Sequence, residues 1–155
     1  MLRPWRPTPG DAAVLAAAWR AAGSSTTTAD VTLRWISGDA DRRAADRALD
    51  LVVASAADDA TALGEVGLRN LDRPRRRAEI GWWIVPEHRN QGLATAAVRL
   101  VSGWALGPPL DLVRVWARID PANAASALVA ERAGFARIGL ADGTDVWAVG
   151  ASLRS

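Results

Sequence analysis

One stretch of the chain limits its fold more than any other, because an apolar run, a glycine-bearing turn and a helical pattern follow one another directly. The run Glu79–Val85 has the apolar character of a strand, and apolar residues recur at helical spacing after Gly92. The first N–H groups of a helix have no partner within the helix, and the helix dipole places partial positive charge there. Because Gly92 has no side chain, an anion can reach these groups, and the stretch predicts a phosphate-binding turn.

The rest of the chain alternates between short strand-like and helical segments, which is typical of a mixed α/β domain. Helical spacing predicts helices over residues 12–22, 39–48, 92–105 and 121–133. β-Branched and alternating segments predict strands over residues 2–6, 51–54, 62–71, 79–85, 112–119, 135–140 and 145–153. Residues 31–36 fit either a strand or a loop. No linker or repeat divides the chain, so we expect one domain over residues 1–155.

Charge and composition argue against several classes of protein. The isoelectric point is near 10.7 although the net charge is only +2, because all 19 basic residues are Arg and the chain has no Lys, Tyr or Cys. The pI is therefore weak evidence for nucleic-acid binding, and no Lys, Tyr or Cys can act in catalysis. The chain also has no signal-peptide pattern and no apolar run near the ~20 residues that span a bilayer. We expect a cytoplasmic protein without membrane or nucleic-acid partners.

Two motifs make the prediction more specific. Arg89, Gly92 and Ala94 fill the pattern Gln/Arg-x-x-Gly-x-Gly/Ala, and a second motif begins at Asn123 and includes Ser126. These motifs resemble those of the GNAT N-acetyltransferases, whose first motif binds acyl-CoA. The strings LRPWRPTPGDA and AEIGWWIVPEHRNQGLATAAVRLVSGWA resemble the RimJ/RimL branch of that superfamily. The resemblance covers nearly the whole chain and is weakest over about residues 24–60.

The resemblance implies a single-domain GNAT fold of the α/β class. In that fold a mixed central sheet of about six to seven strands is flanked by about four helices, and a splayed strand pair holds acyl-CoA. It also implies an acetyl-CoA-dependent N-acetyltransferase that uses no metal, in which a primary amine attacks the thioester directly. The amine is left open between a protein N-terminal α-amine and a small molecule, and a homodimer is left open too. The alternatives are a catalytically degenerate CoA-binding module and an Arg-rich protein that binds RNA or the ribosome.

The resemblance further implies which residues hold the cofactor. The pyrophosphate is expected at the N–H groups of residues 91–95, with help from Arg89. The pantetheine arm is expected beside Ile84 and Val85, and the Val85 N–H is expected to face the thioester carbonyl as an oxyanion donor. The complete set of expected cofactor-binding residues is Ile84, Val85, Arg89, Gln91, Gly92, Leu93, Ala94, Thr95 and Asn123.

On the helix over residues 121–133, Ser126 is the residue that the resemblance implies in catalysis. Many members of the superfamily have a Tyr at the position of Ala130, proposed to protonate the departing thiolate, and this chain has no Tyr. In the RimJ/RimL branch, a Ser at the position of Ser126 is assigned beside the thiol instead. A hydroxyl is too weakly acidic to be a strong acid, but it can donate a hydrogen bond to a thiolate.

A carboxylate is expected to take the proton of the incoming amine, which arrives mostly protonated. Glu79 is the leading candidate, because it lies in the strand where histone acetyltransferases of the superfamily carry a glutamate proposed as the base. The alternative role for Glu79 is an ion pair with Arg76 or Arg77. Asp142 and Asp145, in the last loop, are the second candidates.

Overall fold

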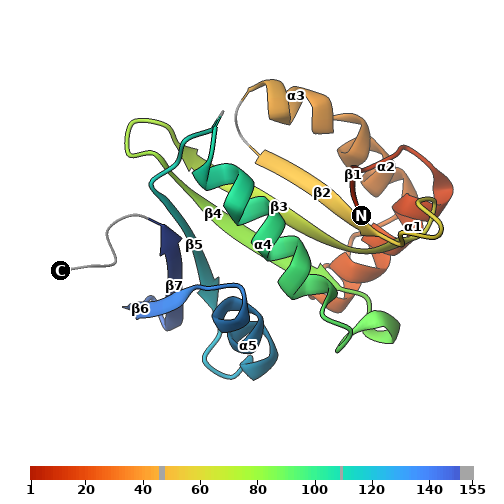
Figure 1. Cartoon of the computed structure of the whole chain (residues 1–155). Helices are drawn as coiled ribbons and strands as arrows, with labels where there is room; N and C mark the ends of the chain where they lie inside the picture. The colour runs from red at the N-terminus through yellow and green to blue at the C-terminus, as the bar shows by residue number, and fades with distance from the viewer. Residues whose placement is uncertain (46–47, 109, 151–155) are drawn as a thin grey trace.

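The computed structural model describes residues 1–45, 48–108 and 110–150 (Figure 1). Seven strands form one sheet in the order β1-β2-β3-β4-β5-β7-β6. The strands are β1 (Leu2–Pro4), β2 (Ala48–Ala54), β3 (Ala62–Asp72), β4 (Arg77–Ile84), β5 (Arg114–Ile119), β6 (Ala136–Ala141) and β7 (Thr144–Gly150). The helices are α1 (Pro9–Ala21), α2 (Ala29–Ser37), α3 (Asp39–Ala44), the 3₁₀ turn η1 (Pro86–His88), α4 (Leu93–Leu106) and α5 (Ala124–Arg132). None of the helices within the described ranges combines the length and apolar character that a membrane crossing requires.

The helices pack on the two faces of the sheet, so that two separate cores form (Figure 1). The larger core lies under α4, where Val98 and Val101 pack against side chains of β3, β4 and β5. The smaller core lies under α1 and α2 on the opposite face, around Trp5, Leu15 and Ile36. Side chains alternate between the faces of a strand, so β4 contributes to both cores.

The sheet opens where β4 and β5 meet. Strands β1 to β4 pair in antiparallel fashion, and β5, β7 and β6 form a second antiparallel group. In the described part of the sheet, the strand pairing that joins the two groups is the parallel pairing of residues 77–79 with residues 114–116. Beyond Glu79 the two strands separate, which confirms the predicted fold with its splayed strand pair (Figure 1).

The main difference from the predicted secondary structure is α2, which occupies the segment that we expected to be a strand or a loop. The Thr28 hydroxyl caps this helix by accepting a hydrogen bond from Val31 N–H (3.3 Å). Thr32 is fully buried, and its hydroxyl contacts the carbonyls of Ala12 (3.1 Å) and Ala29 (2.9 Å). β-Branched residues suggested a strand, but capping and packing against α1 override that local preference.

Two predicted segments reach beyond the described residues. The helix expected over residues 39–48 ends at Ala44, and β2 begins at Ala48, whereas residues 46–47 lie outside the described ranges. The strand expected over residues 145–153 is β7, which is described up to Gly150; residues 151–153 lie outside.

Candidate functional site

The predicted phosphate-binding turn lies between the end of β4 and the first turn of α4. Gly92 has a φ of 77°, and a Cβ at this position would meet no atom within 4 Å. The first hydrogen bond of α4 runs from Ala96 N–H to the Gly92 carbonyl (3.0 Å), so the preceding N–H groups have no helical partner. The side chains of Thr8, Thr28 and Asn123 cap α1, α2 and α5, whereas no side chain in the described part of the chain caps α4. The α4 N-terminus is therefore open to an anion.

A cavity of about 410 Å³ lies against this helix end, with walls from β4, the turn, α4 and α5. The structure brings most of the predicted site residues to it: Ile84, Arg89, Gly92, Leu93, Ala94, Thr95, Asn123 and Ser126. Glu79, Val85 and Gln91 are not among its lining residues. Residues that sequence analysis did not assign to the site also line it, among them Trp82, Trp83, His88 and Arg132. An elongated ligand with an anionic end would fit these walls.

Arg89 connects the turn to the end of β4. Its Nε donates a hydrogen bond to the Ile84 carbonyl (3.0 Å), which holds the side chain at the rim of the cavity. A guanidinium has five N–H donors, so others remain for an anion beside the helix end. The fixed guanidinium adds positive charge to that of the α4 N-terminus.

The direction of the β4 backbone corrects one prediction. Val85 N–H donates to the Leu63 carbonyl of β3 (2.9 Å), so this group points away from the opening between β4 and β5. The expected role of Val85 N–H as oxyanion donor is therefore wrong. Backbone groups of successive strand residues point to opposite sides, so the N–H and carbonyl of Ile84 point toward the opening, as do those of Trp82. Both residues line the cavity.

Helix α5 places Ser126 at the cavity, and the Asn123 side chain caps the start of this helix. The Asn123 side chain accepts a hydrogen bond from Ser126 N–H (3.0 Å), so Asn123 caps α5 as well as lining the cavity. Ser126 is half-buried. Ala130 is fully buried in the larger core, where its small side chain packs against the sheet. Of these positions, Ser126 is the one that presents a hydroxyl to the cavity.

The predicted carboxylates lie apart from this cavity. Glu79 accepts a hydrogen bond from Asn70 Nδ2 (2.7 Å), and its expected alternative partners, Arg76 and Arg77, pair with other carboxylates. That alternative is therefore wrong, while a role for Glu79 as base stays a prediction.

The second candidates for the base lie at the β6–β7 hairpin. Asp145 forms an ion pair with Arg137 (2.6 Å), and Asp142 is exposed at the turn between the two strands. Across the described ranges, no group of three or more His, Cys, Asp or Glu side chains is arranged to hold a metal ion.

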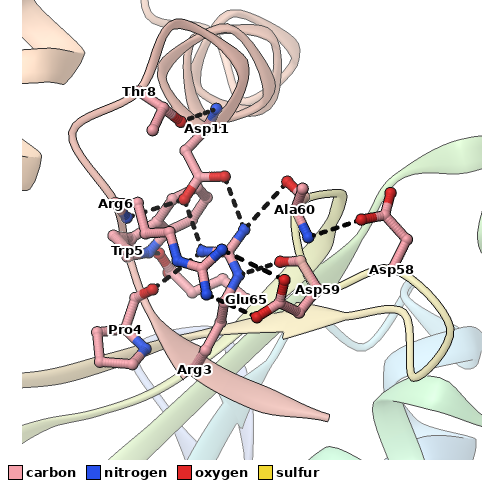
Figure 2. A network of polar contacts seen from close by, with 10 residues as sticks. All are labelled: Arg3, Pro4, Trp5, Arg6, Thr8, Asp11, Asp58, Asp59, Ala60 and Glu65. Atoms are coloured by element: carbon pink, nitrogen blue, oxygen red, sulfur yellow. Dashed lines mark hydrogen bonds and ion pairs between the residues drawn. The ribbon is translucent and has the colours of Figure 1, made fainter.

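A carboxylate that sequence analysis did not single out is buried in β3. Glu65 is 6% exposed, and its Oε2 accepts a hydrogen bond from Trp5 Nε1 (2.8 Å; Figure 2). Burial, together with the neighbouring Asp50 carboxylate, raises the pKa of Glu65 to about 7. The sequence did contain a sign of this burial, because Glu65 is the one acidic residue in the run Ala62–Leu68, whose other residues are apolar or small.

The raised pKa of Glu65 predicts a pH-dependent stability. An ordinary Glu titrates near 4.5 and this one near 7, so its stabilising contribution is present below pH 4.5 and is lost as the pH rises through 7. The difference corresponds to about 3 kcal/mol. Glu65→Gln keeps an acceptor for Trp5 but does not titrate. Urea unfolding at pH 5 and pH 8 measures the free energy of unfolding. From pH 5 to pH 8 this free energy should fall more in wild type than in Glu65→Gln. Equal changes in both proteins would contradict the raised pKa of Glu65.

Comparison with known proteins supports a family assignment. Residues 1–136 match the model of the acetyltransferase (GNAT) domain. The "Putative ribosomal N-acetyltransferase YdaF" of Bacillus subtilis is 40% identical over 83 residues, which are 54% of this chain and 45% of that protein. The "Uncharacterized N-acetyltransferase YoaA" of the same bacterium is 33% identical over 78 residues, or 50% of this chain and 44% of that protein. The matched region thus spans about half the length of these curated relatives.

Solved structures show the same fold over nearly the whole chain. A probable acetyltransferase is 26% identical, with a TM-score of 0.77, 96% of this chain covered and 91% of that one. Mycobacterium smegmatis RimJ in complex with CoA-disulfide is 24% identical, with a TM-score of 0.76 and coverages of 97% and 81%. The splayed sheet and the open end of α4 are features expected of the family whose domain model matches this chain. This chain belongs to the acetyltransferase (GNAT) domain family.

Proposed function

We propose that the protein is an acetyl-CoA-dependent N-acetyltransferase that acetylates a primary amine. The observation that carries this proposal is the cavity, which joins the uncapped N-terminus of α4 to the C-terminal end of β4, beyond the last residue that pairs with β5. The first end suits a pyrophosphate, and at the second the backbone N–H groups of Trp82 and Ile84 point toward the opening, where an extended arm can reach them. RimJ, which shares the fold, was solved with CoA-disulfide, and this supports CoA as the ligand.

Each part of the cavity has a role in the proposed reaction. The N–H groups of the first α4 turn and the guanidinium of Arg89 hold the pyrophosphate. The backbone N–H of Ile84 or Trp82 donates to the thioester carbonyl, where negative charge develops during attack. The amine attacks that carbonyl directly, since the chain has no Cys to form a covalent acyl intermediate. Ser126 donates a hydrogen bond to the departing thiolate.

The acceptor is a protein N-terminal α-amine or a small-molecule amine. A protein acceptor is supported by the name of YdaF and by that of a Vibrio cholerae protein with a TM-score of 0.77, a "putative ribosomal-protein-serine acetyltransferase". Spermidine N-acetyltransferases of the same fold support a small polyamine. A protein α-amine loses its proton more easily, because its ordinary pKa is about 7.7–8.0 against 10.4 for a side-chain amine.

Thiol release from acetyl-CoA tests the proposal. The acceptors are peptides with a free α-amine, the same peptides with a blocked α-amine, and a set of polyamines. We expect release with one class of free amine, together with thermal stabilisation of the protein by acetyl-CoA. Stabilisation without release from any acceptor would indicate a degenerate CoA-binding module. RNA affinity that falls steeply with salt, without stabilisation by acetyl-CoA, would indicate a nucleic-acid binder instead.

Replacement of Ser126 by Ala should slow the chemical step. Loss of one hydrogen bond to a charged group corresponds to a fall in kcat of about tenfold to a hundredfold, while the Kd for acetyl-CoA should change little. Single-turnover kinetics and calorimetry measure the two quantities separately. Ser37→Ala, which removes an exposed hydroxyl on α2, is the matched control. Equal kcat values for wild type and Ser126→Ala would remove Ser126 from the mechanism.

A further inference from the structure

The buried carboxylate of β3 lies at the level of the sheet where the acyl group is expected. The antiparallel register places Glu65 opposite Trp83, between the two β4 residues whose backbone groups face the opening. Glu79 lies four residues earlier on β4, which is about 13 Å along the strand from Trp83. Of the two carboxylates, Glu65 is therefore the one nearer along the sheet to Trp82 and Ile84, although neither carboxylate is among the residues that line the cavity.

Trp83 links Glu65 to the cavity. Trp83 lies opposite Glu65 in the register, lowers the pKa of that carboxyl as a neutral donor, and stacks on Trp5 with ring centroids 6.3 Å apart. The same residue lines the cavity. Glu65 and Trp83 face the α1 side of the sheet, whereas α4 covers the other side. Pairing between β4 and β5 stops at Glu79, so we expect an amine to approach between these strands from the face opposite the helix end.

An exposed cation lies beside the carboxylate. Arg69 Nη2 lies 3.8 Å from Glu65 Oε1, which is too far for a direct hydrogen bond, and the Arg69 side chain is 50% exposed. The guanidinium lies over Gly81, where no side chain intervenes. An incoming ammonium group can take the place of this loosely held cation without leaving the carboxylate unpaired.

We propose that Glu65, rather than Glu79, accepts the proton of the acceptor amine. The ammonium N–H bond breaks and its proton forms an O–H bond on the Glu65 carboxylate, which leaves a neutral amine with a free electron pair. That pair forms the new C–N bond at the thioester carbonyl, and the C–S electrons leave with sulfur, which takes the second amine proton. The neutral Glu65 then returns its proton to solvent. This inference rests on the proposed function.

The neighbours of Glu65 support this role. Burial raises its pKa and so does Asp50 from β2, whose carboxylate lies over Gly67. Arg69 lowers it, as do the neutral donors Trp5 and Trp83. On α1, Asp11 is already paired with a buried Arg. The charged side chains of α3 act on Asp50, namely Arg42, Asp39 and Arg43. The net result is a carboxylate that changes charge near neutral pH, which suits a general base.

The pH dependence of kcat/KM tests the inference, with the acceptor found by thiol release. Wild type should show a rising limb with an apparent pKa of about 7. Glu65→Gln should lose this limb and about a hundredfold in rate at pH 7, with partial recovery at high pH, where the amine deprotonates by itself. Glu65→Asp should keep the limb because it keeps a carboxylate. Glu131→Gln, an exposed position on α5, is the control.

A second readout does not depend on turnover. The chain has four Glu residues, so a protein labelled with carboxyl-¹³C glutamate should give four signals. The signal missing from Glu65→Gln should titrate near pH 7. Unchanged acetyl-CoA affinity and a cooperative melt in this variant would show that the fold and the cofactor site are intact.

Three results would overturn the inference. One is a wild-type rate and pH profile in Glu65→Gln; another is loss of the limb in Glu79→Gln instead; the third is a Glu65 signal that titrates near 4.5. If wild type itself released no thiol with any amine, the proposed function would fail, and the inference would fail with it.

Discussion

Replacement of Gly92 by Glu should abolish acetyl-CoA binding, with a loss of at least a hundredfold in affinity by titration calorimetry. The α4 N-terminus has no side-chain cap, and Gly92 is its N-cap residue. A carboxylate there would occupy the place of the pyrophosphate and repel it at close range. It would also satisfy the free N–H groups as an internal cap, so that an external anion gains little.

Two control variants separate this effect from damage to the backbone. Gly92 has a φ of 77°, so any side chain costs about 1–2 kcal/mol in that conformation. Gly92→Ala carries this strain without the charge and should keep most of the affinity. Gly103→Glu adds the same carboxylate on α4, at a position where a Cβ meets no atom within 4 Å. Unchanged affinity in Gly92→Glu would refute the pyrophosphate site, and an equal loss in all three variants would show a nonspecific effect.

Elements with strong local signals were predictable from the sequence. The Thr8 cap, the glycine-bearing turn before α4 and the strands β3 and β4 each follow from short-range chemistry, and the structure has them. Helix α2 was not predictable in this way, because Val31 and Thr32 favour a strand locally. Its helical state depends on burial of Thr32 against α1, which is a contact between distant residues.

The site was predictable in its location but not in its backbone geometry. The motif put Arg89 and Gly92 on one turn, and both line one cavity, because spacing along a turn is local. Which side of β4 the Val85 N–H faces depends on the register with Leu63, and a shift of one residue reverses the answer. Glu65 was missed because its significance comes from Trp5 and Asp50, which lie on other strands or segments.

The same N-terminal segment contains a buried ion pair that holds β1 to α1 (Figure 2). Arg3 donates two parallel hydrogen bonds to Asp11, at 2.7 and 2.8 Å, and the two residues are 6% and 1% exposed. The Arg6 N–H donates to the same carboxylate (2.9 Å). Arg3 also contacts the Asp59 carbonyl in the loop between β2 and β3. The pair of Arg3 and Asp11 thus connects three segments: β1, α1 and the loop between β2 and β3.

Asp11→Ala should lower the free energy of unfolding by about 3–5 kcal/mol, because it leaves the Arg3 guanidinium buried without a counter-charge. This is a large part of the 5–15 kcal/mol that stabilises an ordinary domain. Urea unfolding followed by Trp fluorescence measures it. Asp59→Ala is the matched control: it removes a carboxylate from the exposed pair with Arg6, and it should change stability little.

A double variant distinguishes an unpaired charge from lost packing as the cause. Arg3→Met combined with Asp11→Ala removes both charges, so the penalty of a buried unpaired guanidinium disappears. We expect the double variant to be more stable than Asp11→Ala alone. If the two single losses of unfolding free energy added, it would be less stable, so this result would show that the two groups interact directly. If the two losses simply added, the pair would contribute through packing alone, and its charge would have no part in joining β1 to α1.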